Sequence, residues 1–247
     1  HIVVCGTSGP WSEGSDYETG WRLAKDHKID MIDEHYYQTP GWFIYHQDYY
    51  DQYDRNGSKV YLGEYAAHTP GRPNNIETAL CEALHICGME RNGDVVAMSS
   101  YAPLLAKEHH TQWNPDMIYF NNKEVKPTVG YYVQKLCGNY CGDEYTESTL
   151  SVNEGRKGVR ERLAVSTVRN SKTGKVYIKM VNHPVKGKLD LSSLKDRFGE
   201  AQSLDARLHV LTGNWDDRNA RPKESDIKVK PEFDYELPAY SFSLIEI

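Results

Sequence analysis

Glu64 is the side chain in this sequence that is best placed to act as a nucleophile or an acid–base group. It follows the apolar, aromatic run 59–63, which rises from a Gly-containing turn and predicts a short buried strand. The loop 69–73, rich in Pro and Gly, begins soon after it. Barrel enzymes place catalytic groups where a strand gives way to a loop, and Gly63 leaves room for a ligand or a neighbouring backbone. A solvated surface carboxylate fits the same pattern, so both interpretations stay open on these residues alone.

The elements that must position Glu64 alternate between strands and helices in the first half of the chain. Strands are predicted at 2–5, 29–34, 59–64 and 94–98, and helices at about 15–27, 41–55, 75–89 and 127–138. Ser15 and Glu18 have the spacing of a capping box for the first helix. Strand and helix units that repeat about every 30 residues indicate parallel strands with helical crossovers.

Two architectures fit this α/β pattern. An open doubly wound sheet is one, but no Gly-rich phosphate loop of the required form follows the first strand. The other is the second half of an eight-stranded (β/α)8 TIM barrel, which agrees with a chain that begins directly on a strand pattern. We therefore predict the half-barrel for residues 1–142, and we expect this chain to be the C-terminal part of a larger protein.

Beyond residue 142 the pattern becomes all-β. Short, nearly alternating runs at 163–168, 176–181, 208–211 and 240–245 are separated by Gly, Pro, Asn and Asp. This texture predicts an antiparallel β-sandwich over residues 143–247, with the polar segment 141–158 as the boundary between the two domains.

Composition excludes several classes of function. The formal net charge is −6 over 247 residues, and Lys and Arg are dispersed, so no basic stripe is available for nucleic acid. No apolar run approaches the roughly 20 residues that span a bilayer. The five cysteines show no zinc-site spacing, and we expect no metal and no organic cofactor. The 18 tyrosines and 5 tryptophans suit stacking on sugar faces, although tyrosine is also common in β-rich cores.

Four motifs, in this order and spacing, carry a resemblance to a known family. They are the segments 33–37 (DEHYY), 61–66 (YLGEYA), 100–104 (SYAPL) and 113–118 (WNPDMI). Together they resemble the C-terminal part of the glycoside hydrolase family 51 α-L-arabinofuranosidases, in the branch shared by plant and gut Bacteroidetes enzymes. The resemblance covers nearly the whole chain and implies the last four strands of the barrel followed by the family's β-sandwich.

The resemblance also implies roles for five residues. Glu64 corresponds to the catalytic nucleophile, and His35 and Tyr37 match the family's His-x-Tyr, in which the tyrosine hydrogen-bonds the nucleophile and lines the sugar site. Trp113 and Asn114 correspond to a loop near that site. The alternatives are a satisfied core histidine for His35, an ordinary wall residue for Tyr37, and a packed loop anchor for Trp113 and Asn114.

The implied reaction is retaining hydrolysis of terminal arabinofuranosyl residues from arabinan- or arabinoxylan-type saccharides. Such enzymes use two carboxyl groups about 5 Å apart, one as nucleophile and one as acid and then base. In the family the acid/base is a Glu preceded by Asn on the fourth strand, which has no counterpart here. The only Asn-Glu pair, Asn153-Glu154, lies in the boundary segment and is an accidental match. We therefore expect the acid/base outside this chain and the chain alone to be inactive, with Glu34 as the one substitute acid.

Other functions remain open from the sequence. The chain could be a carbohydrate-binding or structural fragment, although the aromatic residues of the predicted sandwich are scattered. A β-xylosidase or an endoglucanase of similar fold is the nearest enzymatic rival. The resemblance further implies an extracytoplasmic enzyme that is a homo-oligomer when intact.

Overall fold

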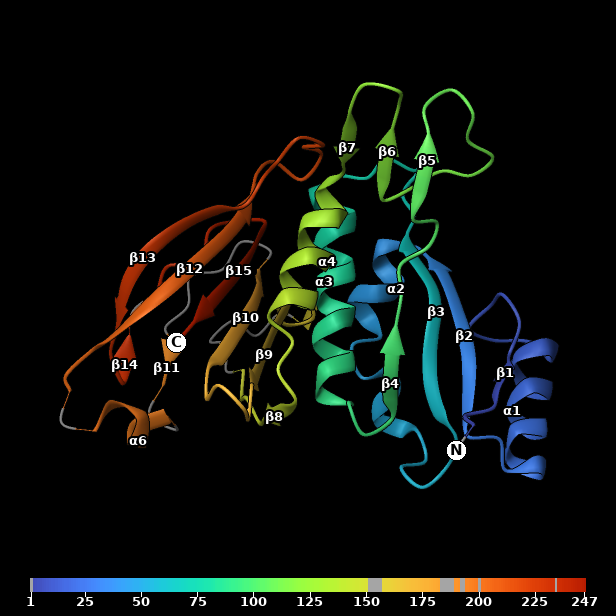
Figure 1. Ribbon diagram of the computed structural model, residues 1–247, viewed down its shortest axis with the longest axis horizontal. Coiled ribbons are helices and arrows are strands. Elements are labelled where there is room, and N and C mark those ends of the chain that lie inside the picture. The colour runs from blue at the N-terminus through green and yellow to red at the C-terminus, as the bar shows by residue number, and fades with distance from the viewer. Residues whose placement is uncertain (1, 151–156, 183–188, 192–193, 200, 234) are drawn as a thin grey trace.

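Four parallel strands form the first sheet of the computed structural model, which describes residues 2–150, 157–182, 189–191, 194–199, 201–233 and 235–247. They are β1 (Cys5–Thr7), β2 (Met31–Gln38), β3 (Lys59–Ala67) and β4 (Val96–Ser99). Their order in space is their order in sequence, and every neighbouring pair is parallel (Figure 1). The carboxyl ends of the strands therefore meet at one edge.

The helices follow the predictions with two differences, and the first strand differs as well. They are α1 (Ser15–His27), α2 (Pro40–Tyr45), the 3-10 helix η1 (Tyr49–Gln52), α3 (Ile76–Arg91) and α4 (Val129–Asn139). The helix expected at 41–55 is thus divided into α2 and η1. The capping box at Ser15 was wrong, because Gly14 is the N-cap of α1 and no side chain caps it. The strand expected at 2–5 begins only at Cys5, and Ile2 is 85% exposed.

The helices cover one face of the parallel sheet. Side chains alternate along β2, so Ile32, Glu34 and Tyr36 are buried while Asp33 and His35 on the other face are only partly buried. Tyr36 contacts Trp42 of α2 and His85 of α3, and Glu34 contacts Trp21 of α1. Every one of these helices therefore packs on the face of β2 that carries Glu34.

Helix α3 is the centre of the hydrophobic core. Asn75 caps it by accepting from the Thr78 amide while the Thr78 hydroxyl bonds back to the Asn75 amide, which satisfies two donors of the first turn. Glu82 on this helix accepts from the backbone amide of Ala67 at 3.0 Å and so ties the end of β3 to α3. Figure 1 shows α3 and α4 between the parallel sheet and the second large sheet.

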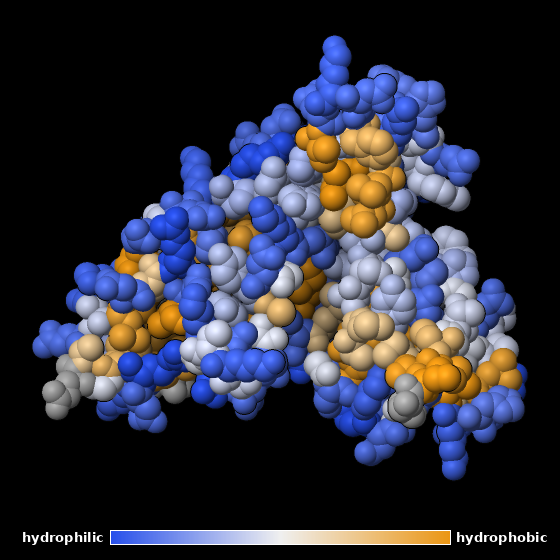
Figure 2. Space-filling model, in the orientation of Figure 1, coloured by the Kyte–Doolittle hydropathy of each residue, from blue (hydrophilic) through white to orange (hydrophobic). Residues whose placement is uncertain are grey.

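A small three-stranded sheet occupies the long segment between β4 and α4. It contains β5 (Leu105–Lys107), β6 (Ile118–Phe120) and β7 (Val125–Pro127), with β5 parallel and β7 antiparallel to β6. Leu105 is 62% exposed on it, and Figure 2 shows a group of apolar side chains on this part of the surface.

The second half of the chain forms a six-stranded sheet in the order β13-β12-β15-β10-β9-β8. The strands are β8 (Glu144–Thr146), β9 (Leu163–Arg169), β10 (Val176–Asn182), β12 (Leu204–Thr212), β13 (Lys223–Val229) and β15 (Ser241–Glu246), and all pairs are antiparallel. This confirms the antiparallel prediction and adds β8 and β13, which were not predicted. The short helix α5 (Lys157–Arg160) precedes β9.

The two faces of the six-stranded sheet have different neighbours. Val181, Leu211 and Phe242 belong to the core around α3 and α4. The opposite face packs Ile178 and Leu208 with Phe198 of α6 (Lys195–Phe198) and Phe233 of β14 (Glu232–Phe233), which pairs with β11 (Leu189–Asp190). In the described residues the second layer is thus a two-stranded sheet and a short helix. None of the described helices is long and apolar enough to cross a membrane.

Candidate active site

A β-bulge in β3 decides where Glu64 points. Glu34 of β2 pairs with Leu62, but the next residue, His35, pairs with Glu64, so Gly63 is the extra residue. Without the bulge, strict alternation would turn Glu64 to the helix-covered face, where Leu62 is fully buried. With it, Glu64 lies on the open face, and its side chain is 41% exposed.

Tyr37 and His35 both approach one oxygen of Glu64. The Tyr37 hydroxyl donates to Glu64 Oε2 at 2.5 Å, and His35 Nδ1 lies 3.5 Å from the same oxygen. Burial, then the hydrogen bond to Glu64 and its charge, raises the pKa of the Tyr37 hydroxyl well above its usual value, so this group stays a donor. One carboxylate oxygen is therefore held from β2, and Oε1 has no such donor among the described residues. The predicted contact between Tyr37 and Glu64 is present.

Asp33 extends this row of side chains along β2. Its Oδ2 lies 2.9 Å from His35 Nε2, and its side chain is 24% exposed. The sequence motif contains Asp33, but no role was predicted for it. The signal was available, because residues 33, 35 and 37 share one face of a strand. Within the described part of the chain, no three His, Cys, Asp or Glu side chains are grouped as a metal site.

His68 was also missed from the sequence. Its ring stacks on Tyr37 with centroids 5.4 Å apart, in the segment that directly follows β3. Burial, and then the charge of Arg72, lowers the pKa of His68, which favours the neutral ring. Tyr37 also packs against the small cluster of Ala66, Tyr101 and Met117, so its ring is fixed from several sides.

Trp113 and Asn114 lie on the loop between β5 and β6, apart from Glu64. Trp113 is 67% exposed, and within the described residues it makes no hydrogen bond or ring contact with Glu64, His35 or Tyr37. The Asn114 side chain accepts from the Tyr119 hydroxyl at 3.2 Å, and its carbonyl accepts from Arg72 at 3.3 Å. Because Arg72 follows β3, this bond ties the loop to the strand edge where Glu64 lies.

The hypothesis that Glu34 serves as the acid was wrong. Its side chain is fully buried on the opposite face of β2 from Glu64. It accepts from Trp21 Nε1 at 2.8 Å and Tyr53 at 2.9 Å, and also from Tyr36. Burial raises the pKa of Glu34 to about 7, against the opposing effect of the hydrogen bonds from Tyr53 and Trp21, but this carboxyl is closed off from the face of the sheet that carries Glu64. Asn153-Glu154 lies outside the described residues.

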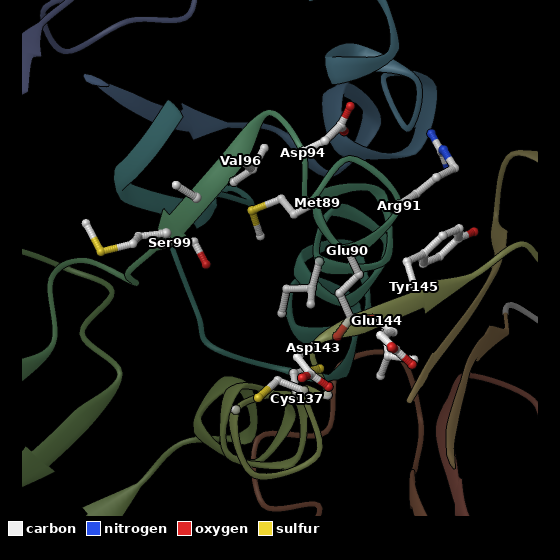
Figure 3. Close-up of a pocket in the computed structure, with 18 of the residues that line it drawn as sticks. Met89, Glu90, Arg91, Asp94, Val96, Ser99, Cys137, Asp143, Glu144 and Tyr145 are labelled. Atoms are coloured by element: carbon white, nitrogen blue, oxygen red, sulfur yellow. The ribbon is translucent and has the colours of Figure 1, made fainter. Parts of the chain in front are cut away.

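A cleft of about 1010 Å³ lies beside the free edge of β4, away from the Glu64 cluster. Its lining comes from the end of α3, β4, the end of α4 and the segment that enters β8. Figure 3 shows Met89 and Val96 on one side of it, Cys137 on α4, and Asp143 and Glu144 near β8. None of the five predicted site residues lines it.

Known proteins match this chain over most of its length. Residues 45–241 match the family described as "Alpha-L-arabinofuranosidase C-terminal domain". An "Extracellular exo-alpha-L-arabinofuranosidase" from Streptomyces chartreusis is 37% identical over 91% of the chain. The chain belongs to the α-L-arabinofuranosidase family. "Alpha-L-arabinofuranosidase 1" from Arabidopsis thaliana is 34% identical to it over 63% of the chain described here.

Solved structures of the family agree with this assignment. An arabinose-bound GH51 α-L-arabinofuranosidase superposes with a TM-score of 0.77 at 34% identity, covering 88% of this chain and 37% of that one. The enzyme from Thermotoga maritima has a TM-score of 0.68 at 16% identity over 98% of this chain and 56% of that one, which shows a shared fold. The chain spans 26% of the Streptomyces protein and 22% of the Arabidopsis protein.

Proposed function

We propose that this chain is the nucleophile-bearing part of a retaining α-L-arabinofuranosidase that releases terminal arabinofuranosyl residues from arabinan- or arabinoxylan-type saccharides. The observation that carries the proposal is the hydrogen bond from Tyr37 to Glu64 on the open face of the parallel sheet. Glu64 is the nucleophile, and Tyr37 and His35 position it. Trp113 and Asn114 belong to a loop that borders the sugar.

The arrangement supports the first step of a double displacement. With Oε2 held by Tyr37, Oε1 of Glu64 attacks the anomeric carbon while the glycosidic oxygen leaves. A second carboxyl group protonates that oxygen and then takes a proton from the water that cleaves the arabinosyl ester. Asp33 on the same face is engaged with His35, and Glu34 is buried behind the sheet. We therefore assign the acid/base to a segment outside this chain.

The same proposal takes residues 1–142 as the second half of a (β/α)8 barrel. In a doubly wound fold, helices cover both faces of a parallel sheet, whereas in a barrel one face is the interior. Here α1, α2 and α3 pack on one face of β2, and the opposite, open face carries Glu64. Met98 on β4, the last strand in the described sheet, is 53% exposed, as expected of a strand against which further barrel strands would lie. Residues 143–247 form the accompanying β-sandwich domain.

We further propose an extracytoplasmic, homo-oligomeric enzyme. The Streptomyces relative is named extracellular, which supports the first part. Because the proposed reaction releases arabinofuranosyl residues, the binding partner of the protein is an arabinose-containing oligo- or polysaccharide.

The test of the nucleophile uses the full-length protein that contains this chain. Glu64→Gly should lower hydrolysis of 4-nitrophenyl α-L-arabinofuranoside by roughly 10⁴-fold or more. Added azide should restore release of nitrophenol and yield the arabinofuranosyl azide of inverted configuration, because azide takes the place of the missing carboxylate. Glu13→Gly, in an exposed loop, is the matched control. Undiminished activity of Glu64→Gly would refute the assignment.

A further inference from the structure

We propose that Asp33 is a positioning residue for Glu64, acting through His35 and through the bulge at Gly63. The inference rests on the proposed function, since it takes Glu64 as the nucleophile. Asp33, His35 and Tyr37 occupy alternate positions of β2 and share the open face of the sheet.

The first contact of Asp33 fixes the ring of His35. An ionised carboxylate only accepts hydrogen bonds, so the Nε2 that lies 2.9 Å from Asp33 Oδ2 must carry a proton. The opposite nitrogen, Nδ1, then faces Glu64 Oε2 at 3.5 Å, and it attracts that oxygen when it also carries a proton, that is, when the ring is an imidazolium between the two carboxylates. Asp33 therefore determines both the rotation of the imidazole and which nitrogen is turned to the nucleophile.

The second contact of Asp33 is with the bulge. A β-carbon on Gly63 would lie 2.0 Å from Asp33 Oδ1, so the carboxylate fills the space that a side chain at position 63 would need. This bulge turns Glu64 onto the open face. The two oxygens of Asp33 thus lie against the two features that aim Glu64: Oδ2 against the ring of His35, and Oδ1 in the space left by the missing side chain of Gly63.

The burial of Asp33 Oδ1 points to a functional demand. This oxygen is buried and has no hydrogen-bond partner among the described residues. Burying an unpaired carboxylate oxygen opposes folding, and such groups gather where a site requires them. An uncharged side chain would fill the same space without that penalty, so we attribute the carboxylate to its action on His35.

The experiment uses the full-length protein and 4-nitrophenyl α-L-arabinofuranoside. Asp33→Asn should lower kcat by roughly 10- to 100-fold, because small misplacements of a reacting group cost rates of that order. KM should change by less than about threefold, since Asp33 does not touch the sugar. Asp30→Asn, the same change at a position just before β2, is the control and should match the unaltered enzyme.

A double-mutant cycle with His35→Gln separates positioning from a structural role. If Asp33 acts through His35, adding Asp33→Asn to His35→Gln should lower kcat by less than about threefold further, because coupled residues are not additive. Asp33→Ser gives a second, smaller variant if Asp33→Asn fails to fold, as judged by its unfolding midpoint.

Three outcomes would overturn the inference: kcat of Asp33→Asn equal to that of Asp30→Asn, a fully multiplicative cycle, or a change confined to KM. Glu64→Gly in the same assay separates the two proposals. If Glu64→Gly is active, the proposed function fails. If it is inactive and Asp33→Asn is normal, this inference alone fails.

Discussion

Glu82 offers a stability test that does not depend on the proposed catalytic roles. Its side chain is 1% exposed on α3, and Oε1 accepts from the Ala67 amide while Oε2 has no partner in the described part of the chain. Burial raises the pKa of this carboxyl from 4.5 to about 8, partly offset by the bond from Ala67. Glu82 is therefore protonated in the folded protein at neutral pH and ionised in the unfolded chain.

The sign of the pH dependence follows from this difference. Between pH 4.5 and 8 the unfolded state has released the Glu82 proton and the folded state has kept it, so the free energy of unfolding falls as the pH rises through this window. At about 1.4 kcal/mol per pKa unit, the loss over this shift is on the order of 5 kcal/mol and levels off above pH 8. Below pH 4.5 both states are protonated and the loss disappears.

The perturbation is Glu82→Gln, which keeps an oxygen for the Ala67 amide and cannot ionise. Urea unfolding followed by circular dichroism should show a small effect at pH 5 and a variant more stable than the parent at pH 8. The pKa of Glu34 is also raised, to about 7, so Glu34 too lowers the free energy of unfolding as the pH rises. Measurements above pH 7 therefore report mainly on Glu82. Glu18→Gln, at an exposed position of α1, is the control. A stability difference between the Glu82→Gln variant and the parent that stays constant from pH 5 to 8.5 would refute the reasoning.

Two further predictions concern single contacts. Tyr37→Phe removes the 2.5 Å bond to Glu64, and since hydrogen bonds to charged groups are worth about 1.5–3 kcal/mol, kcat of the full-length enzyme should fall by roughly 10- to 100-fold. Its unfolding midpoint should barely move because the phenyl ring still stacks on His68; unchanged kcat would contradict the role of Tyr37. Lys179 is fully buried and donates to Glu90, so Lys179→Met should destabilise the fold by about 3–5 kcal/mol in urea unfolding. Adding Glu90→Gln to Lys179→Met should recover part of the lost stability, because it removes the carboxylate that has lost its ammonium partner. No recovery would contradict this explanation of the loss.

The sequence predicted most of the regular elements because their local signals agreed. The helix predicted at 75–89 from apolar positions at helical spacing runs from Ile76 to Arg91, and its start is fixed locally by the Asn75 cap. The antiparallel strands β9, β10 and β15 were predicted from alternation. These elements are specified by residues close in the chain, so distant contacts did not alter them.

The failures occurred where distant contacts set the backbone. Aromatic side chains between positions 42 and 53 have helical spacing, but they pack around Glu34 and Tyr36 from two short helices instead of one. Strand β13 was missed because its residues are mostly exposed and charged, as suits the edge of a sheet. The position of the loop with Trp113 and Asn114 depends on Arg72, which no local pattern reveals.

The candidate site shows the same limit most sharply. A period-two pattern along β3 places Glu64 on the face of Val60 and Leu62, beneath the helices, where an ionised carboxylate could not meet a sugar. Only the extra residue at Gly63 brings it to the face of His35, and a β-carbon there would lie 2.0 Å from Asp33 Oδ1 across the strand pair, so the bulge requires glycine. The resemblance to the family named Glu64 as a candidate, but its orientation is a tertiary property of β2 and β3 together. It follows that a variant at position 63 or 33 should alter the site while every local propensity of the rest of β3 remains intact.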